Sequence, residues 1–397
     1  MVVWLASFFA ACSTPPVSAQ EYAPAVSGRV DSGTPQPPVA STTAKHRDGW
    51  DLAAVISAAY DSNLFLNSKN PQSDMVVKLA PAIAYSKGSA DDGEGGYVKA
   101  GYRPTLVVYA SHASQNRVDQ EAMADLGWRG KITRITYSGL VRKLGDATPE
   151  TGSPTNRLEY ENKIVAAWIP REKITLEAAA GYDSRNYSDP TYYDSRKIYG
   201  EVALRYAYSP KTQLGIIYQI GRFHVDGSGN QDTHQLTGSI SWQPREKIRV
   251  NLVAGAEHRK KANGAKVSPV LDGRIEWDPR KGTKLYLDGY MREEASAFYA
   301  GQNYSVRGFT AGITQRIRGP WTAKLEGGYE TNSYRLVSGQ GVSGRNDRIW
   351  FVRPAVICRV GDASDLTFFY QYSGDQSNAT YFGYTRQLVG VEFNHPF

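Results

Sequence analysis

The chain has 397 residues, enough for several ordinary domains or for one large sheet. Hydrophobic residues make up only 41% of it, and it holds no run of about 18 apolar residues, which excludes a helical membrane protein. The 46 Lys and Arg and the 39 Asp and Glu residues are spread along the whole chain. Because nucleic-acid binding needs basic residues gathered on one face, we expect no nucleic-acid partner. With 38 Gly, 26 Tyr and only 4 Met, the composition favours an all-β fold.

The first 48 residues differ from the rest. Residues 2–11 form a short apolar run, and small residues lead up to Ala19, so residues 1–19 are predicted to be a secretory signal peptide. An alternative uses Phe9-Ala10-Ala11-Cys12, which resembles a lipoprotein box and would place a lipid on Cys12 instead of removing it with the signal. Residues 20–48 are rich in Pro, Ser and Thr and have no periodicity, which predicts a disordered tail. The folded part is therefore expected to span residues 49–397.

The beginning of the folded part alternates less regularly than the remainder. Residues 115–142 could hold two strands or a distorted hairpin. Four prolines fall inside apparent strands: Pro81, Pro104, Pro269 and Pro354. In a closed sheet each of them costs a ladder hydrogen bond unless a bulge accommodates it.

Short turns with a common signature follow from about residue 168. They read Trp168-Ile169-Pro170, Tyr208-Ser209-Pro210, Trp242-Gln243-Pro244 and Trp277-Asp278-Pro279, with Gly319-Pro320-Trp321 as a variant, and they lie 34 to 41 residues apart. Each interval holds one hairpin. Between these turns we expect longer polar connections at 183–194, 225–232, 259–266, 295–303 and 337–347.

Strict alternation with a period of two marks the strands themselves. Apolar residues at every second position run from Trp321 to Tyr329 and from Val389 to Phe393, and Phe397 continues the series after a departure at His395. Short turns at one end and longer loops at the other predict an antiparallel transmembrane β-barrel of about 16–18 strands.

The position of the aromatic residues decides between this barrel and a soluble sandwich. A Trp or Tyr lies on the apolar side at nearly every short turn, and Tyr182, Tyr218, Tyr329 and Tyr372 mark a second girdle near the long loops. Such rings belong at the two lipid–water interfaces. We therefore predict location in a Gram-negative outer membrane, with lipid as a partner and the tail of residues 20–48 in the periplasm. Phe393 and the terminal Phe397 resemble the signal read by the barrel assembly machinery, a second expected partner.

Several motifs resemble a known family. Gly49-Trp50-Asp51-Leu52, then residues 60–66 (Tyr-Asp-Ser-Asn-Leu-Phe-Leu), Ser73-Asp74 and Leu79-Ala80-Pro81 are similar to the opening of the outer-membrane β-barrel porin family found near exopolysaccharide gene clusters. Residues 300–304, 327–330, 350–354 and 368–372 resemble that family as well. The resemblance covers nearly all of residues 49–397. It implies an outer-membrane barrel associated with polysaccharide export, it implies that some in-strand prolines are family features, and it carries no known active site.

The polar face of each strand would point into the lumen and supplies the candidate site residues. The predicted pore lining comprises Arg205, Arg249, Glu257, Arg274, Glu276, Asp288, Arg292, Arg316, Glu326, Arg353, Arg359, Arg386 and Glu392. These side chains could line a water-filled pore or form an ion-pair network that fills a narrow lumen; the predicted strand number favours the pore. Inward aromatic residues that could stack on sugar rings are Tyr199, Tyr286, Tyr290 and Phe369, with simple lumen packing as the alternative.

These features predict a pore for diffusion or export of hydrophilic solutes. Exopolysaccharide and its export components are candidate partners. The alternative is a non-conducting structural or assembly barrel. We expect no enzyme, because no motif places a His beside a Ser on an adjacent strand. We also expect no cofactor and no metal. Residues 226–232 resemble a calcium loop but lack the required Gly and Glu, so they are predicted to form a plain hairpin loop.

Overall fold

The computed structural model describes residues 48–397 except 89–92, 228, 262–263, 300–301 and 335–343. The predicted signal peptide and tail lie outside the described residues. The described residues form eighteen strands and one 3₁₀ helix, η1 (Ala113–Gln115). The strands are β1 (Gly49–Asp61), β2 (Asp74–Lys87), β3 (Gly95–Tyr109), β4 (Arg117–Arg129), β5 (Thr133–Leu144), β6 (Arg157–Arg171), β7 (Ile174–Tyr187), β8 (Ser195–Ser209), β9 (Thr212–Val225), β10 (Gly229–Arg245), β11 (Ile248–Lys261), β12 (Gly264–Arg280), β13 (Thr283–Ala295), β14 (Asn303–Arg318), β15 (Trp321–Tyr334), β16 (Asn346–Val360), β17 (Ser364–Ser377) and β18 (Tyr384–Pro396).

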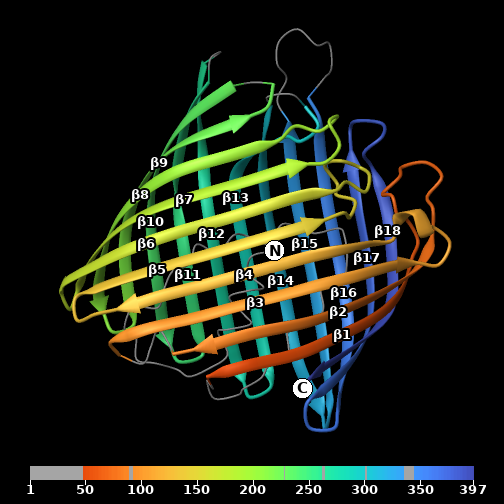
Figure 1. The fold of residues 1–397 in the computed structure, drawn as a ribbon, viewed down its shortest axis with the longest axis horizontal. Coiled ribbons are helices and arrows are strands. Elements are labelled where there is room, and N and C mark those ends of the chain that lie inside the picture. The colour runs from red at the N-terminus through yellow and green to blue at the C-terminus, as the bar shows by residue number, and fades with distance from the viewer. Residues whose placement is uncertain (1–47, 89–92, 228, 262–263, 300–301, 335–343) are drawn as a thin grey trace.

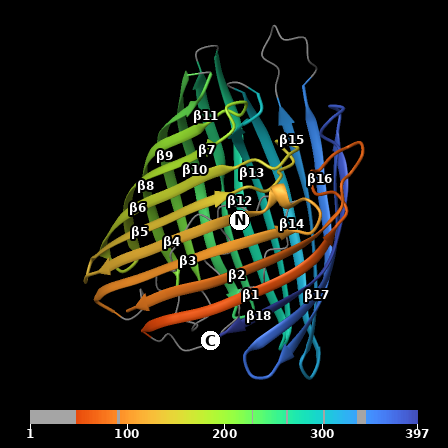
Figure 2. The same ribbon diagram turned by 45° about the vertical axis from the view of Figure 1, so that its right-hand side comes forward.

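The strands close into one antiparallel barrel. Each strand pairs with its neighbours in the chain, and β1 pairs with both β2 and β18, which closes the ring (Figure 1). At the closing seam, Ile56 lies opposite Phe393 and the Phe397 amide donates to the Leu52 carbonyl at 2.8 Å. A turned view shows the strands inclined around the whole wall (Figure 2). The predicted fold class is confirmed. Among the described residues, no helix is long and apolar enough to cross a bilayer.

Two faces of the wall follow from the alternation in the sequence. Large apolar side chains at every second position are exposed to the outside, while their neighbours in sequence face inward and include many buried charges. An aromatic ring is exposed beside most short turns: Trp50, Trp128, Trp168, Tyr208, Trp242, Trp277 and Trp321. Tyr182, Tyr218 and Tyr329 are exposed toward the other end. Tyr372 is only half-buried there and contacts Trp350 at 4.8 Å between ring centroids. An apolar outer band between two rings of aromatic side chains is the outer surface expected of a transmembrane β-barrel.

The Trp-x-Pro signature marks a bulge before a tight turn. The register shifts between Trp168 and Arg171, between Trp242 and Arg245, and between Trp277 and Arg280. A proline has no N–H to give to the ladder, so placing it at a bulge removes the cost of the missing bond.

The in-strand prolines lie where pairing is interrupted. Pro81 and Pro104 fall in one shared gap, since the β2–β3 ladder skips from Leu79 to Ile83 on β2. Pro354 falls in a gap of the β16–β17 ladder, which skips from Val352 to Ala355. Pro269 lies beyond the paired part of β12 and β13, which begins at Leu271. A single interruption of the β2–β3 ladder therefore accommodates two of the four prolines.

Some connections are shorter than the sequence predicted. The β9–β10 connection occupies only residues 226–228, because β10 already begins at Gly229. The β11–β12 connection occupies only residues 262–263, because β11 continues to Lys261 and β12 begins at Gly264. The calcium-like stretch 226–232 is thus a hairpin turn running into β10, as predicted. Residues 117–144 form the regular hairpin β4–β5, so the distorted alternative was wrong.

Candidate functional site

The predicted pore-lining residues lie on the inward face, and most of them are held in ion pairs. Arg205 bonds Glu177 at 2.8 Å, Arg249 bonds Glu276 at 2.8 Å and Arg359 bonds Asp365 at 2.6 Å. The same holds for Glu257 with Arg259, Arg274 with Glu276 and Asp288, Arg292 with Glu294, Glu326 with Lys324, and Arg386 with Asp61. The exposed Arg316 instead donates to the Gly319 carbonyl at 3.3 Å. The inner wall is therefore charged but largely neutralised, partly by pairs between strands and partly by pairs two residues apart on one strand.

Arg353 and Glu392 are exceptions within the described part of the chain. Neither forms an ion pair or a side-chain hydrogen bond there, and Glu392 is only 1% exposed. The Arg353 guanidinium lies 4.7 Å from the centre of the Phe369 ring, a cation–π contact. Among the predicted pore-lining residues, these two, on β16 and β18, have no direct polar partner within the described part of the chain.

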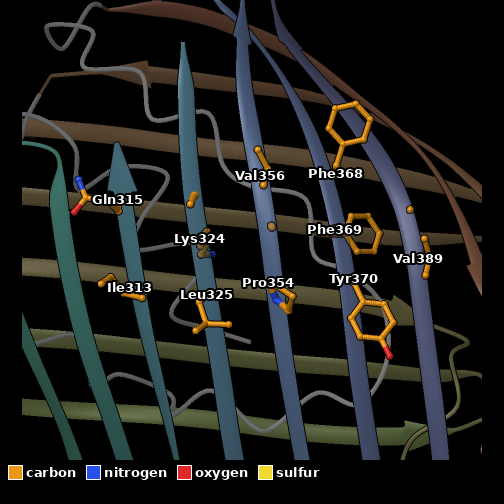
Figure 3. A pocket seen from close by; sticks show the side chains of 13 residues that line it. Ile313, Gln315, Lys324, Leu325, Pro354, Val356, Phe368, Phe369, Tyr370 and Val389 are labelled. Atoms are coloured by element: carbon orange, nitrogen blue, oxygen red, sulfur yellow. The ribbon is translucent and has the colours of Figure 1, made fainter. Parts of the chain in front are cut away.

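The wall beside Arg353 is hollowed. A cavity of about 550 Å³ lies where the prolines and small residues of β14–β18 leave room, and its lining includes Leu325, Pro354 and Phe368 from the outward face and Phe369 from the inward face (Figure 3). The interruption of the β16–β17 ladder at Pro354 lies within this hollow.

The four aromatic stacking candidates have different surroundings. Tyr290 and Phe369 are buried, and Arg292 and Arg353 cover a face of these two rings. Tyr286 donates its hydroxyl to Glu326, and the Tyr199 ring contacts the Lys197 ammonium at 4.9 Å. Only the half-buried Tyr199 and Tyr286 present accessible ring surface in this conformation.

A segment that the sequence did not single out crosses the long-loop end of the lumen. We call residues 145–156, between β5 and β6, the mouth segment. It folds back on itself, because Ala147 pairs with Pro154 and the Gly152 amide donates to the Thr148 carbonyl at 2.8 Å. Gly152 has a φ of +64°, a backbone conformation that favours glycine at this turn.

The tip of the mouth segment is held by the opposite wall. The Arg345 guanidinium donates to the carbonyls of Pro149 at 2.8 Å and Glu150 at 3.1 Å. Arg345 precedes β16, which lies across the ring from β5 and β6 in the strand order. A backbone tip bound by a buried guanidinium is firmly placed, since these carbonyls would otherwise be buried without donors.

The Glu150 side chain makes a second attachment. Its carboxylate accepts from the Ala297 amide at 2.6 Å and from the Tyr304 hydroxyl at 3.4 Å. Both partners belong to the β13–β14 connection and the start of β14. Glu150 is only 1% exposed, so the carboxylate is buried against groups that bond it.

The base of the mouth segment is fixed to its own wall. Asp146 pairs with Arg157 at 2.8 Å, and Ala147 packs with Leu66 and Tyr384. Burial alone would raise the pKa of the Asp146 carboxyl, but the charges of Arg157 and Arg117 outweigh it and hold that pKa below its ordinary value. Leu66 adopts a φ of +52°, which is strained for a leucine and lies within this cluster.

Other connections meet the mouth segment at the same end. The Ser153 and Tyr192 hydroxyls lie 3.0 Å apart, and the Tyr193 amide donates to the Ala297 carbonyl at 2.9 Å. The Phe382 ring from the β17–β18 connection lies 3.4 Å from the Arg345 guanidinium. Loops from both sides of the barrel thus narrow the mouth. Most of the longer connection expected at residues 337–347 falls outside the described residues. Its end anchors the mouth segment through Arg345, which pairs with Asp347.

The C-terminal end corrects one prediction. Ser364 and His395, on the adjacent strands β17 and β18, lie 2.7 Å apart, although the sequence suggested no such pair. The His395 ring lies parallel to the Phe393 ring and meets the Phe397 ring edge to face, and Ser364 is buried. Among the described residues no carboxylate lies within hydrogen-bond distance of the His395 ring, so the pair lacks the third member that a catalytic triad requires. Within the described residues, no cluster of His, Cys, Asp and Glu could hold a metal.

Comparisons with known proteins find similar structures at low sequence identity. The outer membrane protein opdK from Pseudomonas aeruginosa is 10% identical and matches 88% of this chain and 99% of its own, with a TM-score of 0.47. OccAB3 from Acinetobacter baumannii is 8% identical over 88% of this chain and 99% of its own, with a TM-score of 0.49. The siderophore receptor PirA from Pseudomonas aeruginosa is 9% identical over 89% of this chain and 81% of its own, with a TM-score of 0.45. No family model and no curated protein matches the chain, so its relation to the exopolysaccharide-associated family stays a prediction.

Proposed function

We propose that this protein is a diffusion channel of a Gram-negative outer membrane for hydrophilic solutes, narrowed at its outer mouth by the mouth segment. The observation that carries this proposal is the closed ring of strands with an apolar exterior and a charged interior. Barrels of about 16–18 strands leave room for water inside. The long loops would face outward, and the N-terminal tail and Phe397 would lie on the periplasmic side.

The charges of the inner wall favour passage of small or polyhydroxylated solutes and do not favour cations or anions alone. Charges of both signs are paired along the lumen, so selectivity between cations and anions is expected to be weak. Exopolysaccharide remains the candidate substrate that the family resemblance supports. Tyr199 and Tyr286 are the rings with accessible surface for a sugar.

Conductance of the purified protein in planar bilayers tests the proposal. We expect open-channel current, and we expect an anionic oligosaccharide to block it if the protein handles sugars. Arg353→Glu and Arg292→Glu should then change the block, because both residues face inward. A current that added oligosaccharide does not reduce would indicate a general porin.

A non-conducting structural barrel is the second candidate. The contacts of the mouth segment with Arg345, Ala297 and Tyr192 favour it, because they cover the outer mouth from several sides. Absence of current at every voltage, both in the intact protein and after shortening of the mouth segment, would support this role and refute the channel.

A further inference from the structure

Basic side chains gather on one part of the outer surface near the long-loop end. They come from four adjacent strands and comprise Arg196 of β8, Arg222 of β9, His234 of β10, and His258 and Lys260 of β11. We call them the outer basic patch. Asp232 pairs in register with Arg222 on one side and Lys260 on the other, and His234 pairs with His258. All five share the outward face with Ile198 and Leu236, so they point away from the lumen.

The patch begins where the apolar band ends. The Tyr218 hydroxyl lies 2.7 Å from His234 Nδ1, and the His234 and His258 rings are 6.5 Å apart. His234 is eight residues from Trp242, which marks the short-turn end of the same strand. That separation is about 27 Å along the strand, or roughly 20 Å along the membrane normal after a tilt of about 40°. The apolar band of such barrels is about 25 Å tall, so His234 lies close to its upper edge. Asp232 is two residues farther from Trp242, or roughly 26 Å along the membrane normal, and its register partners Arg222 and Lys260 therefore lie at the level of lipid headgroups.

The charge of the patch is available for a ligand. Arg196 and Lys260 form no ion pair within the described part of the chain and are exposed. Arg222 pairs with Asp232 at 3.0 Å, but these side chains are 64% and 50% exposed, so the pair is weak and easily exchanged.

The patch is local rather than a girdle around the barrel. Near the long-loop ends of β1–β4 the outward face carries exposed apolar side chains instead: Tyr60, Met75, Val108 and Val118. Arg307 of β14 and Arg348 of β16 are also exposed on the outward face, but each pairs in register with Thr331 of β15 and not with another basic residue. Basic side chains on adjacent strands, as on β8–β11, favour recognition of a particular group there.

From these positions we infer that the outer basic patch binds the phosphate groups of a phosphorylated outer-leaflet glycolipid. Arg and Lys are the side chains that bind phosphate through charge-assisted hydrogen bonds, and the apolar surface directly below would contact the acyl chains. The inference rests on the membrane location and orientation of the proposed function, but not on conduction through the lumen.

Binding of defined lipids to the full purified chain in non-ionic detergent tests the inference. The probes are a diphosphorylated lipid A, phosphatidylcholine as a lipid without net charge, and inorganic phosphate, and native mass spectrometry counts the bound molecules. We expect retention of the diphosphorylated lipid and loss of roughly tenfold or more in affinity for Arg196→Glu/Lys260→Glu, given about 1 kcal/mol per basic residue near a lipid surface. The matched control is Lys211→Glu/Arg245→Glu, which makes the same charge change at the exposed short-turn ends of these strands.

Three outcomes would overturn the inference. They are equal weakening by both double variants, equal retention of phosphatidylcholine, and saturable binding of inorganic phosphate that displaces the lipid. Conductance measured on the same preparations separates the two proposals. A protein that conducts but does not discriminate these lipids refutes only the patch, whereas one that binds the lipid without conducting refutes only the channel.

Discussion

Arg345 and Glu150 meet across the barrel although 195 residues separate them in the chain, with Arg345 Nη1 donating to the Glu150 carbonyl at 3.1 Å. Arg345 is 2% exposed and also pairs with Asp347 at 2.7 Å. One guanidinium therefore ties the tip of the mouth segment to the far wall. The width of the mouth depends on this contact.

Arg345→Met should release the tip of the mouth segment. It removes the donors to Pro149 and Glu150 and leaves the buried Asp347 carboxylate without its cation, at a cost of about 3–5 kcal/mol. We expect a lower unfolding temperature in detergent and larger, noisier current in bilayers. Arg245→Met removes an exposed guanidinium at the short-turn end of β10 and should change neither quantity. An unchanged unfolding temperature for Arg345→Met would contradict the assigned contact.

Shortening the mouth segment should enlarge the channel without disturbing the wall. Ala147 and Pro154 already pair with each other, so deletion of residues 148–153 joins positions that are adjacent in space. We expect severalfold higher conductance with an unchanged β-rich circular dichroism spectrum. Equal conductance before and after the deletion would show that the segment does not limit flow.

Asp61→Asn should weaken the closing seam. The Asp61 carboxylate at the end of β1 pairs with Arg386 of β18, and both side chains are buried. Removing one partner of a buried pair costs about 3–5 kcal/mol, because it leaves the other charge uncompensated. The temperature at which the unboiled gel band shifts to the unfolded position should fall. Asp232→Asn, in an exposed pair, serves as the control and should cost about 1 kcal/mol or less.

Deletion of Phe397 should impair assembly into the membrane. Its backbone amide bonds Leu52 across the seam at 2.8 Å, and its ring is 80% exposed on the outside, where a recognition partner can reach it. We expect reduced yield of the heat-modifiable folded form in membranes. Tyr381→Ala changes another highly exposed aromatic ring at the opposite end and should assemble normally. Normal insertion of the deletion variant would refute this role.

Acid should loosen the base of the mouth segment through Asp146. The pKa of its carboxyl lies below the ordinary value of 3.8 because, despite burial, Arg157 and Arg117 favour the charged form. A lowered folded-state pKa stabilises the fold above the unfolded value, and this contribution is lost as pH falls below about 3.8 through the folded-state pKa. Unfolding temperatures measured from pH 7 to pH 2 should therefore fall more steeply for the wild type than for Asp146→Asn. Parallel curves would contradict the assignment.

The faces of the wall could be predicted because alternation is a local property. Trp242 and Ser241 lie on opposite faces of one strand, and a shift of one residue in the pairing register would exchange them. Trp242 faces lipid because placing a polar group in hydrocarbon costs free energy. The short turns could be predicted for a similar reason. A proline has no N–H to donate to the ladder, so it needs a bulge or a position where the pairing of two strands ends. The same reasoning overestimated the 225–232 and 259–266 connections, because polar residues such as Asp232 and Lys260 continue a strand once it rises above the apolar band.

The sequence by itself determined the strands, the inward position of residues such as Arg292 and Glu326, and the aromatic girdles. Only the tertiary structure decided which charges pair between strands, that Arg353 and Glu392 lack ion-pair partners among the described residues, and that residues 145–156 narrow the mouth. The reason is the separation along the chain of the residues that determine each of these features. The side-chain period belongs to neighbouring residues, whereas the contact between Glu150 and Arg345 exists only after β1 pairs with β18 and brings opposite walls to a fixed separation.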